Sequence, residues 1–420
     1  MMKLPNFLSK GFFFAITMWL TSRLFIAVIM LLVAPLLPSP PGGLAATFSW
    51  DVFNAWDSKQ YNIVSTQGYT DSQNGEPSAI VAFFPLFPLI VRAIMTVGLP
   101  FEVAGTLVNN LAFLGALIVL YIWINERHGV NAARWTTAVL AWFPLSLFGT
   151  VIYTEGLYLL LSTAALGAFD NQKYGWTALW GSLATATRPT GIALWISFVL
   201  VTILDRRGIG AFLASLSTGC GLLLFSFYCQ IKYNDPLAFL HAQKAWRPSW
   251  GFDWIRWLKM FMQILVGTTN WKYGYIKDPW HPLLFLMITI MGYLLWRFRK
   301  QLAARKVRYG FAFLGLLLWL LAGDPLTNVV MIVGGIYLLW LFRTEISTSA
   351  LVYGLCAIAM LLASGGTISL NRLAYGVVSL SIALGLLLSH HPRWGYVVLS
   401  SLSIPLASFA VRFAQDLWVA

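Results

Sequence analysis

The sequence predicts an all-α, polytopic membrane protein. Hydrophobic residues make up 59% of the 420 residues and charged residues only 10%, and the mean hydropathy is +0.73. A soluble protein of this length would carry about 25% charged residues. Apolar runs long enough to cross a bilayer recur from one end of the chain to the other. Together these observations exclude a soluble core and predict a bundle of membrane helices.

The apolar runs predict about 11–13 transmembrane helices. Their expected ranges are 11–37, 79–97, 103–125, 135–153, 155–170, 174–204, 209–230, 282–297, 309–322, 325–342, 347–363, 373–389 and 395–413. The first run is too long for the apolar core of a signal peptide, and no small-residue cleavage site follows it. We therefore expect an uncleaved first span with its N-terminus inside.

The net charge of +13 is concentrated in short loops. Counting spans from an inner N-terminus places four loops in the cytoplasm: Asp205–Gly208, Arg297–Arg308, Arg343–Glu345 and His390–Arg393. All four are basic or rich in histidine, as the positive-inside rule requires, and this explanation of the charge leaves no case for nucleic-acid binding. Glu126–Arg134 departs from the rule, because it falls outside despite two arginines. One short run between residues 79 and 170 is therefore expected to be a hairpin or re-entrant segment, which leaves the side of Glu155 open.

We expect one integral membrane domain over residues 1–420, with two long loops on the outer face. The first loop covers residues 38–78, the second covers 232–281, and residues 282–420 form a C-terminal helical bundle. The second loop is dense in Trp, Tyr and Lys, which favour the headgroup layer of a bilayer. Both outer loops are therefore expected to contain interfacial helices.

A short helix in the first loop is expected to present a carboxylate to a cavity. Residues three and four apart form two stripes. The apolar stripe, expected to face the membrane, consists of Phe53, Trp56, Ile63 and Val64. The polar stripe consists of Asp57, Gln60 and Tyr61. Asp51 lies about 240° around the helix from Asp57 at roughly 100° per residue, so we interpret it as an N-cap or entry-turn residue and Asp57 as the catalytic candidate.

Three charged residues inside or beside apolar runs are further candidates, because such residues are costly in a membrane and usually functional. Arg188 interrupts the run 174–204, and Pro189 and Gly191 break the helix beside it. Arg372 lies at the outer end of a span, where headgroup contact is the alternative to a site role. Glu155 lies between two apolar runs and is either a turn residue or part of the site.

The second outer loop supplies further donors in the stretch "NDPLAFLHAQKAW". Its candidates are Asp235, His241, Gln243, Lys244 and Trp246. Taken singly, each is typical of a solvated loop, and Asn234-Asp235-Pro236 is typical of a turn or helix cap. Taken together, they give this loop the groups needed to face Asp57.

A carboxylate among cations and tryptophans suits the transfer of a sugar from a phosphate ester. The carboxylate accepts the proton of an acceptor hydroxyl. Arginine or lysine stabilises the negative charge that builds up on the phosphate. Tryptophan faces stack on the sugar, and a polyprenyl chain fits between membrane helices.

The motifs resemble the PIG-V-like family, named for GPI mannosyltransferase II, within the C-type glycosyltransferase fold. The motifs that carry the resemblance are "WDSKQYNIVSTQGY", "AFFPLFPLI", "YTEGLYLLLS", "ATRPTG" and "NDPLAFLHAQKAW", in this order over roughly residues 50 to 250. The essential Trp-Asp pair of the family matches Trp56-Asp57, and its Arg-x-x-Gly signature matches Arg188 to Gly191. The C-terminal third shows no aligned motif, so Arg372 is carried over only by span pattern.

The resemblance implies an outer-face inverting transferase that uses a polyprenyl-phosphate sugar, typically mannose, and no nucleotide sugar. The sugar is then a co-substrate, and no cofactor or metal is expected, since neither outer loop contains Asp-x-Asp. Nothing in the sequence indicates an organelle. We expect a bacterial inner (plasma) membrane protein with a site facing the periplasm or exterior and a glycan or glycolipid acceptor.

Two other functions compete with a transferase. A transporter or flippase of a lipid-linked sugar explains the many spans and Arg188, but such proteins usually contain inverted repeats, and we find none. A non-catalytic scaffold that kept the fold would be expected to lose the polar residues at the base position. Asp57 and Arg188 are both present, which favours the enzyme.

Overall fold

The structure is a computed structural model that describes residues 6–70, 78–247 and 250–419. Within these ranges every regular element is a helix, apart from an isolated bridge between Gly251 and Ser364. Five helical segments of the described chain are long and apolar enough to cross a membrane: Gly11–Leu36, Phe101–Trp142, Ile209–Tyr233, Ala304–Leu341 and Pro392–Ala414. The predicted all-α, multi-pass membrane protein is confirmed.

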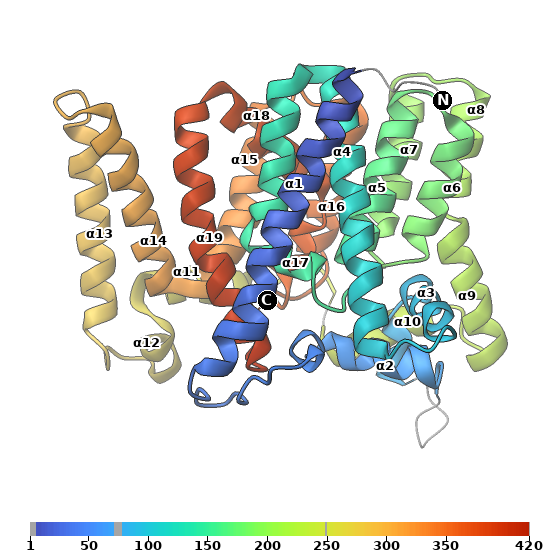
Figure 1. Ribbon diagram of the computed structural model, residues 1–420, viewed down its shortest axis with the longest axis horizontal. Coiled ribbons are helices and arrows are strands. Elements are labelled where there is room, and N and C mark those ends of the chain that lie inside the picture. Colours follow the sequence, from blue (N-terminus) through green and yellow to red (C-terminus); the bar gives the residue numbers. More distant parts are fainter. Residues whose placement is uncertain (1–5, 71–77, 248–249, 420) are drawn as a thin grey trace.

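Most helices run between two ends of the molecule (Figure 1). They are α1 (Asn6–Val28), α4 (Phe101–Trp142), α5 (Glu155–Asp170), α6 (Tyr174–Thr185), α7 (Gly191–Leu204), α8 (Ile209–Thr218), α9 (Cys220–Tyr233), α13 (Trp280–Arg297), α14 (Ala304–Val329), α15 (Gly335–Leu341), α16 (Thr348–Leu362), α18 (Val378–His390) and α19 (Pro392–Ala414). One end, at the top of Figure 1, carries the turns between α5 and α6, α7 and α8, and α13 and α14. These turns contain Lys173, Arg206 and Arg299, and we call this end the basic end.

The opposite end, which we call the loop end, holds the segments 38–70, 78–85, 234–247 and 250–279 (Figure 1). Its short helices are α2 (Asp57–Thr66), α3 (Leu86–Met95), α10 (Ala238–Ala242), α11 (Trp254–Val266), α12 (Thr268–Tyr273) and α17 (Leu370–Tyr375). Helices at this end therefore form a layer across the ends of the long helices.

The expected span 79–97 is wrong. Ala79–Ala82 form a 3₁₀ turn, and α3 begins only after Pro85 and has 10 residues. At 1.5 Å per residue it is about 15 Å long, half of what a bilayer core requires. In Figure 1, α3 lies in the layer at the loop end.

The next two expected spans, 103–125 and 135–153, are the two arms of α4, which reverses at Gly129. Gly129 has φ 79°, a left-handed conformation that side chains disfavour. Because α3 is not a span, this turn lies at the basic end (Figure 1), which removes the conflict of Glu126–Arg134 with the charge rule. The second arm ends at Trp142, earlier than expected, and a 3₁₀ turn over Pro144–Gly149 follows it.

The expected single span 174–204 is also wrong, because the chain reverses within it. Helix α6 ends at Thr185, α7 begins at Gly191, and the two helices pack side by side. Pro189 lacks the N–H that a continuous helix needs. The carbonyl of Ala186, the C-cap residue of α6, accepts the Leu86 N–H at 3.1 Å. This reversal adds the crossing that α3 fails to supply, so the loops after residue 204 stay on the sides predicted for them.

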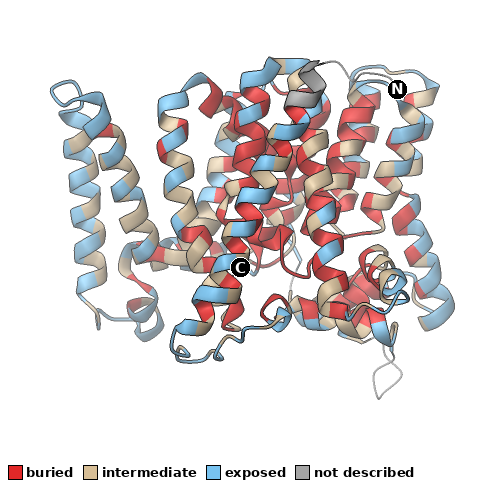
Figure 2. Cartoon of the chain, viewed as in Figure 1, coloured by how far each residue is buried: buried red, intermediate tan, exposed pale blue. Residues whose placement is uncertain are grey.

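Short helices form the centre of the bundle, and the long ones surround it. Figure 2 shows the buried residues gathered in the middle of the molecule. Helices α5 and α18, with 16 and 13 residues, are buried along almost their whole length, whereas no residue of α13 is buried. The short central helices α5, α7 and α18 begin part of the way into the bundle (Figure 1). That arrangement leaves room above the layer at the loop end for a site.

Candidate active site

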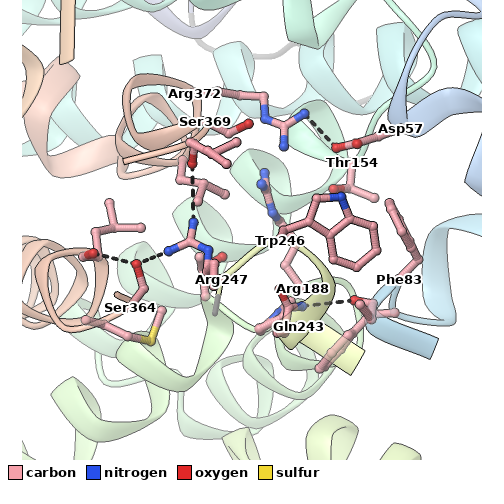
Figure 3. A pocket seen from close by; sticks show the side chains of 18 of the residues that line it. Asp57, Phe83, Thr154, Arg188, Gln243, Trp246, Arg247, Ser364, Ser369 and Arg372 are labelled. Carbon is pink, nitrogen blue, oxygen red and sulfur yellow. Dashed lines mark hydrogen bonds and ion pairs between the residues drawn. The ribbon is translucent and has the colours of Figure 1, made fainter. Parts of the chain in front are cut away.

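A cavity of about 420 Å³ lies where α5 and α7 begin and α16 ends. Its charged lining residues come from five separate segments and are Asp57, Glu155, Arg188, Arg247 and Arg372. Figure 3 shows Arg188, Arg247 and Arg372 reaching into the same space. The structure thus brings both loops that were expected on the outer face, and the C-terminal bundle, together at one site.

Asp57 is the first residue of α2, at the edge of the cavity. Trp56, with φ 57° and ψ −117°, turns the chain sharply before the helix begins. The Asp57 backbone N–H donates to the Tyr153 hydroxyl at 3.2 Å, and its carboxylate accepts a hydrogen bond from Arg372 Nη1 at 2.7 Å (Figure 3). The side chain remains 22% exposed. Asp57 is therefore held on both sides but still reaches the cavity.

Glu155 links the two arginines deeper in the site. Its side chain has no exposed surface, and Oε1 lies 2.8 Å from Arg188 Nη1 and 3.6 Å from Arg372 Nε. A buried charge is tolerated only when another charge compensates it. The order Asp57–Arg372–Glu155–Arg188 is therefore a continuous row of alternating charges. This places Glu155 at the same end as Asp57 and answers the question that the span count left open.

Arg247 is a site residue that the sequence analysis did not single out. It donates to the Ser364 hydroxyl and, at 3.5 Å, to the Ile368 carbonyl (Figure 3). Burial, together with the positive charges of Arg372 and Arg256, lowers the pKa of Arg247 to about 10. The only sequence signal for Arg247 as a site residue was its position next to Trp246. A lone arginine in a loop is more often solvated, so this signal was not enough.

Three guanidinium groups and two carboxylates line the cavity, so its lining carries one positive charge in excess. Asp57 accepts a hydrogen bond from Arg372, and Glu155 forms ion pairs with Arg188 and Arg372. Arg247 instead donates to two neutral oxygens, those of Ser364 and Ile368. Charge-assisted hydrogen bonds to guanidinium groups are the usual means of binding phosphate. The excess positive charge of the lining therefore suits the binding of an anion such as a phosphate.

Aromatic and apolar side chains make up much of the remaining wall. Trp246 packs edge-on against Phe83 with ring centroids 5.7 Å apart, and Tyr61 packs against Phe83 at 5.1 Å. Gln243 donates to the Ala82 carbonyl at 3.5 Å. The apolar lining residues include Phe84, Ile192, Leu240, Met360 and Leu373. The wall can therefore hold a sugar ring next to a hydrocarbon chain.

Of the residues expected at the site, Asp57, Tyr61, Glu155, Arg188, Gln243, Trp246 and Arg372 line the cavity. Trp56, His241 and Lys244 do not. Trp56 turns away because of its left-handed backbone: its Nε1 donates to the Leu417 carbonyl at 3.3 Å and its ring packs edge-on against Trp418. His241 pairs with Asp235 at 2.7 Å on the exposed side of α10, and Lys244 is exposed.

The expected helix in the first loop exists, but it begins later. Trp50–Phe53 form a separate 3₁₀ turn whose N-cap is Ser49, not Asp51. The Ser49 hydroxyl donates to the Asp51 carboxylate at 2.8 Å, so Asp51 is an exposed entry-turn residue. The expected membrane-facing stripe is wrong, because Phe53 and Val64 are buried in the protein core. Asp51 is not among the residues that line the cavity.

Comparisons with known proteins agree with the predicted resemblance. No family model matches the chain. The chain is similar to human GPI alpha-1,6-mannosyltransferase 2, with 20% identity over 260 residues, which are 53% of this chain and 51% of that protein. It thus spans about half the length of this curated relative. The predicted resemblance to the family of this enzyme is confirmed as a similarity of sequence.

The chain also aligns with solved structures of other proteins. The apo oligosaccharyltransferase of Archaeoglobus fulgidus aligns with a TM-score of 0.48 and 13% identity over 97% of this chain and 56% of that chain. ArnT from Cupriavidus metallidurans, bound to undecaprenyl phosphate, aligns with a TM-score of 0.37 and 12% identity over 87% and 77% of the two chains.

Proposed function

We propose that the chain is an inverting membrane glycosyltransferase that moves a hexose from a polyprenyl-phosphate donor to a hydroxyl of a glycan or glycolipid acceptor. The observation that carries the proposal is the row Asp57–Arg372–Glu155–Arg188 along a cavity with an excess of positive charge. The Asp57 carboxylate can accept the proton of the acceptor hydroxyl, and the arginines of the same cavity can bind the donor phosphate. The similarity to GPI alpha-1,6-mannosyltransferase 2 supports mannose as the sugar.

The transfer is a single displacement. The acceptor oxygen forms a bond to the anomeric carbon, while the bond from that carbon to the phosphate oxygen breaks and its electron pair leaves with polyprenyl phosphate. The hydroxyl proton passes to the Asp57 carboxylate. Attack opposite to the leaving group inverts the anomeric carbon, and a single carboxylate is enough for this chemistry.

The arginines act on the leaving group. Charge on the phosphate rises as the bond to the sugar breaks, so fixed cations stabilise the transition state more than the ground state. Arg188 and Arg247 approach the cavity from the α6–α7 break and the second outer loop. A phosphate between them would also attract Arg372, which in the resting site neutralises Asp57. Donor binding thereby makes the carboxylate available as a base.

The apolar part of the wall is suited to the first isoprene units of the donor. Phe84, Ile192 and Leu240 line it at the loop end of the bundle. We propose that the donor lipid stays in the bilayer, that no metal or cofactor takes part, and that the site faces the periplasm or exterior of a bacterial plasma membrane.

A transfer assay tests the proposal. Purified protein in detergent receives radiolabelled polyprenyl-phosphate mannose and a membrane-lipid extract, and the wild type is compared with Asp57→Asn and Asp51→Asn. We expect label in a new lipid with the wild type and Asp51→Asn, and a loss of at least about 100-fold with Asp57→Asn. Activity lost in Asp51→Asn but kept in Asp57→Asn would contradict the assignment. Movement of donor across proteoliposomes without a new product would favour a transporter.

A further inference from the structure

A second cavity, of about 600 Å³, adjoins the first at the loop end. Ile368, Ser369 and Trp418 line both cavities and form the wall between them. The other lining residues are mainly polar and come from α11, α12, α14, α17 and the loop before α17. They include Arg256, Lys259, Gln263, Thr268, Asp324, Asn328, Thr367 and Asn371.

Asn371 marks this cavity as a built polar site. Its side chain is 1% exposed, and its Nδ2 group has no hydrogen-bond partner among the described residues. The rest of the residue is fixed, because Oδ1 accepts the Arg372 N–H at 2.7 Å and its own N–H donates to Asn328 Oδ1 at 2.8 Å. Buried amides are almost always satisfied, so a fixed and unpaired donor at a cavity wall is suited to a ligand oxygen.

Acceptors and a cation complete the site. Asp324 directly follows Gly323, where φ of 57° breaks α14, and its Oδ1 has no hydrogen-bond partner among the described residues. Lys259 on α11 makes no ion pair within the described chain, whereas Arg256 is held by Asp253 at 3.1 Å. The cavity therefore offers amide donors, a carboxylate acceptor and an unpaired ammonium group.

The position of Asn371 relates the two cavities. It precedes Arg372 in α17, and Arg372 holds Asp57 in the first cavity. A molecule seated in the second cavity and reaching past Trp418 would therefore bring a hydroxyl to Asp57.

On the basis of the proposed transferase function, we infer that the second cavity binds the polar headgroup of the acceptor. The chemistry of its wall selects a headgroup rich in hydroxyls that carries an anionic group next to Lys259. The first cavity, with its apolar wall and three arginines, is left for the donor lipid phosphate.

Kinetics with each substrate varied in turn test this division. Lys259→Met and Gln263→Leu alter only the second cavity, and Lys272→Met removes an exposed cation that lines neither cavity. We expect the two cavity variants to raise the KM for the acceptor about tenfold and to leave the KM for the donor within about twofold. Lys272→Met should match the wild type in both constants. Unchanged acceptor KM in both cavity variants would overturn the inference.

Supplying the organic-phase lipid extract and the water-soluble glycan fraction in separate reactions shows which source provides the headgroup. Transfer of label from the donor to a molecule of either fraction, with the KM shift in the cavity variants, supports the site.

A binding readout separates failure of this inference from failure of the proposed function. Gln263→Cys and Lys272→Cys are each combined with Asp57→Asn and labelled with a maleimide, and labelling is followed by mass spectrometry of the corresponding peptides. We expect the acceptor fraction to slow labelling at position 263 at least fivefold, to leave position 272 unchanged, and polyprenyl phosphate alone to protect neither. Protection without transfer by the wild type would refute the transferase and keep the headgroup site. Transfer without protection would refute the headgroup site alone.

Discussion

Glu155 is the anion that allows two arginines to be buried beside each other. Arg188 and Arg372 are 8% and 9% exposed in their side chains, and both contact the same carboxylate oxygen. Removing one partner of a buried ion pair costs about 3–5 kcal/mol, because the remaining charge keeps its desolvation penalty. Here one removal would leave two like charges facing each other. Glu155 therefore holds the two arginines in place, and under the proposed function it fixes them for the donor phosphate.

We expect Glu155→Gln to lower the unfolding free energy by about 3 kcal/mol, since the amide keeps the shape but not the charge. Thermal unfolding of the purified variant in detergent measures the effect. Asp51→Asn, an exposed carboxylate of the same loop end, serves as the control and should unfold like the wild type. A Glu155→Gln protein of wild-type stability would show that the arginines find another counter-ion.

Replacement of Arg372 by lysine tests whether the planar shape of its guanidinium group is required. A planar guanidinium contacts Asp57 and Glu155 through different nitrogens, whereas the lysine ammonium is a single point charge. We expect Arg372→Lys to reduce the rate of transfer about 100-fold while the protein stays folded. Arg92→Lys, at a surface arginine that binds the Ser65 and Thr66 carbonyls, is the matched control. Equal rates in the two variants would remove Arg372 from the chemistry.

At the scale of single elements, helix breaks bring charged residues to the site. The break between α6 and α7 positions Arg188, and the start of α5 positions Glu155. The Pro189 and Gly191 breakers predicted a break from the sequence alone, but not that the chain reverses there. Reversal depends on close packing of α6 against α8 and α9, which no local pattern reveals.

Gly221 on α9 allows this helix to pack closely against α6, because glycine has no side chain. A methyl group there would meet the Ser182 carbonyl oxygen of α6 and lie 2.6 Å from the Ala186 nitrogen. We expect Gly221→Ala to lower the unfolding free energy by about 2 kcal/mol through overpacking. Gly315→Ala on α14 is the matched control, because nothing lies within 4 Å of its added methyl group. Thermal unfolding compares the two, and a larger loss at position 315 would contradict the packing argument.

Helix α10 carries a pH-dependent anchor. Burial raises the pKa of Asp235, but the hydrogen bonds to the His241 ring and the Leu237 N–H outweigh burial and lower the pKa overall. Because the folded-state pKa is below the unfolded value of about 3.9, Asp235 stabilises the loop above that value, and the contribution is lost as the pH falls through the folded-state pKa. Asp235→Asn should unfold slightly earlier than the wild type at pH 7. The difference should shrink below about pH 4; a constant difference would contradict the anchor.

Over the whole molecule, two wrong span predictions cancelled each other in the number of membrane crossings. The expected span 79–97 is not a crossing, whereas the expected single span 174–204 makes two. Composition and the charge rule were enough to predict the fold class, because they follow directly from the membrane environment. The sequence pattern could not distinguish α3, a short helix in the layer at the loop end, from a span. It also could not show that α6 and α7 are two crossings, since short central helices are shielded from lipid by others and need not reach the length of an isolated span.

The same limit applies to the site. Asp57, Glu155 and Arg188 stood out because a charge between apolar runs is rare. Arg247 did not, because its burial arises only when the second outer loop folds against Ser364 and Ile368. Trp56 was expected in the cavity, since a motif gives residue types but not the left-handed backbone that turns this ring away.

Chain topology is testable on intact cells. Val130→Cys lies at the reversal of α4 at the basic end, and Lys272→Cys lies at the loop end; both positions are exposed. We expect a membrane-impermeant maleimide to label position 272 and to spare position 130 until the cells are opened. Labelling of position 130 from outside would place Glu126–Arg134 on the outer face and contradict the arrangement.

The reversal at Arg188 also bears on how the protein is made. Helices α6 and α7 have 12 and 14 residues and are about 18 and 21 Å long, so neither matches the roughly 30 Å hydrocarbon core alone. We therefore expect them to insert together as a hairpin, with Arg188 at its tip. Glu155 precedes this hairpin in the chain and meets its counter-ion only after the hairpin has been inserted. During synthesis the Glu155 carboxyl group is therefore made before its arginine partners, and the row of alternating charges is assembled only after α6, α7 and α17 have been inserted.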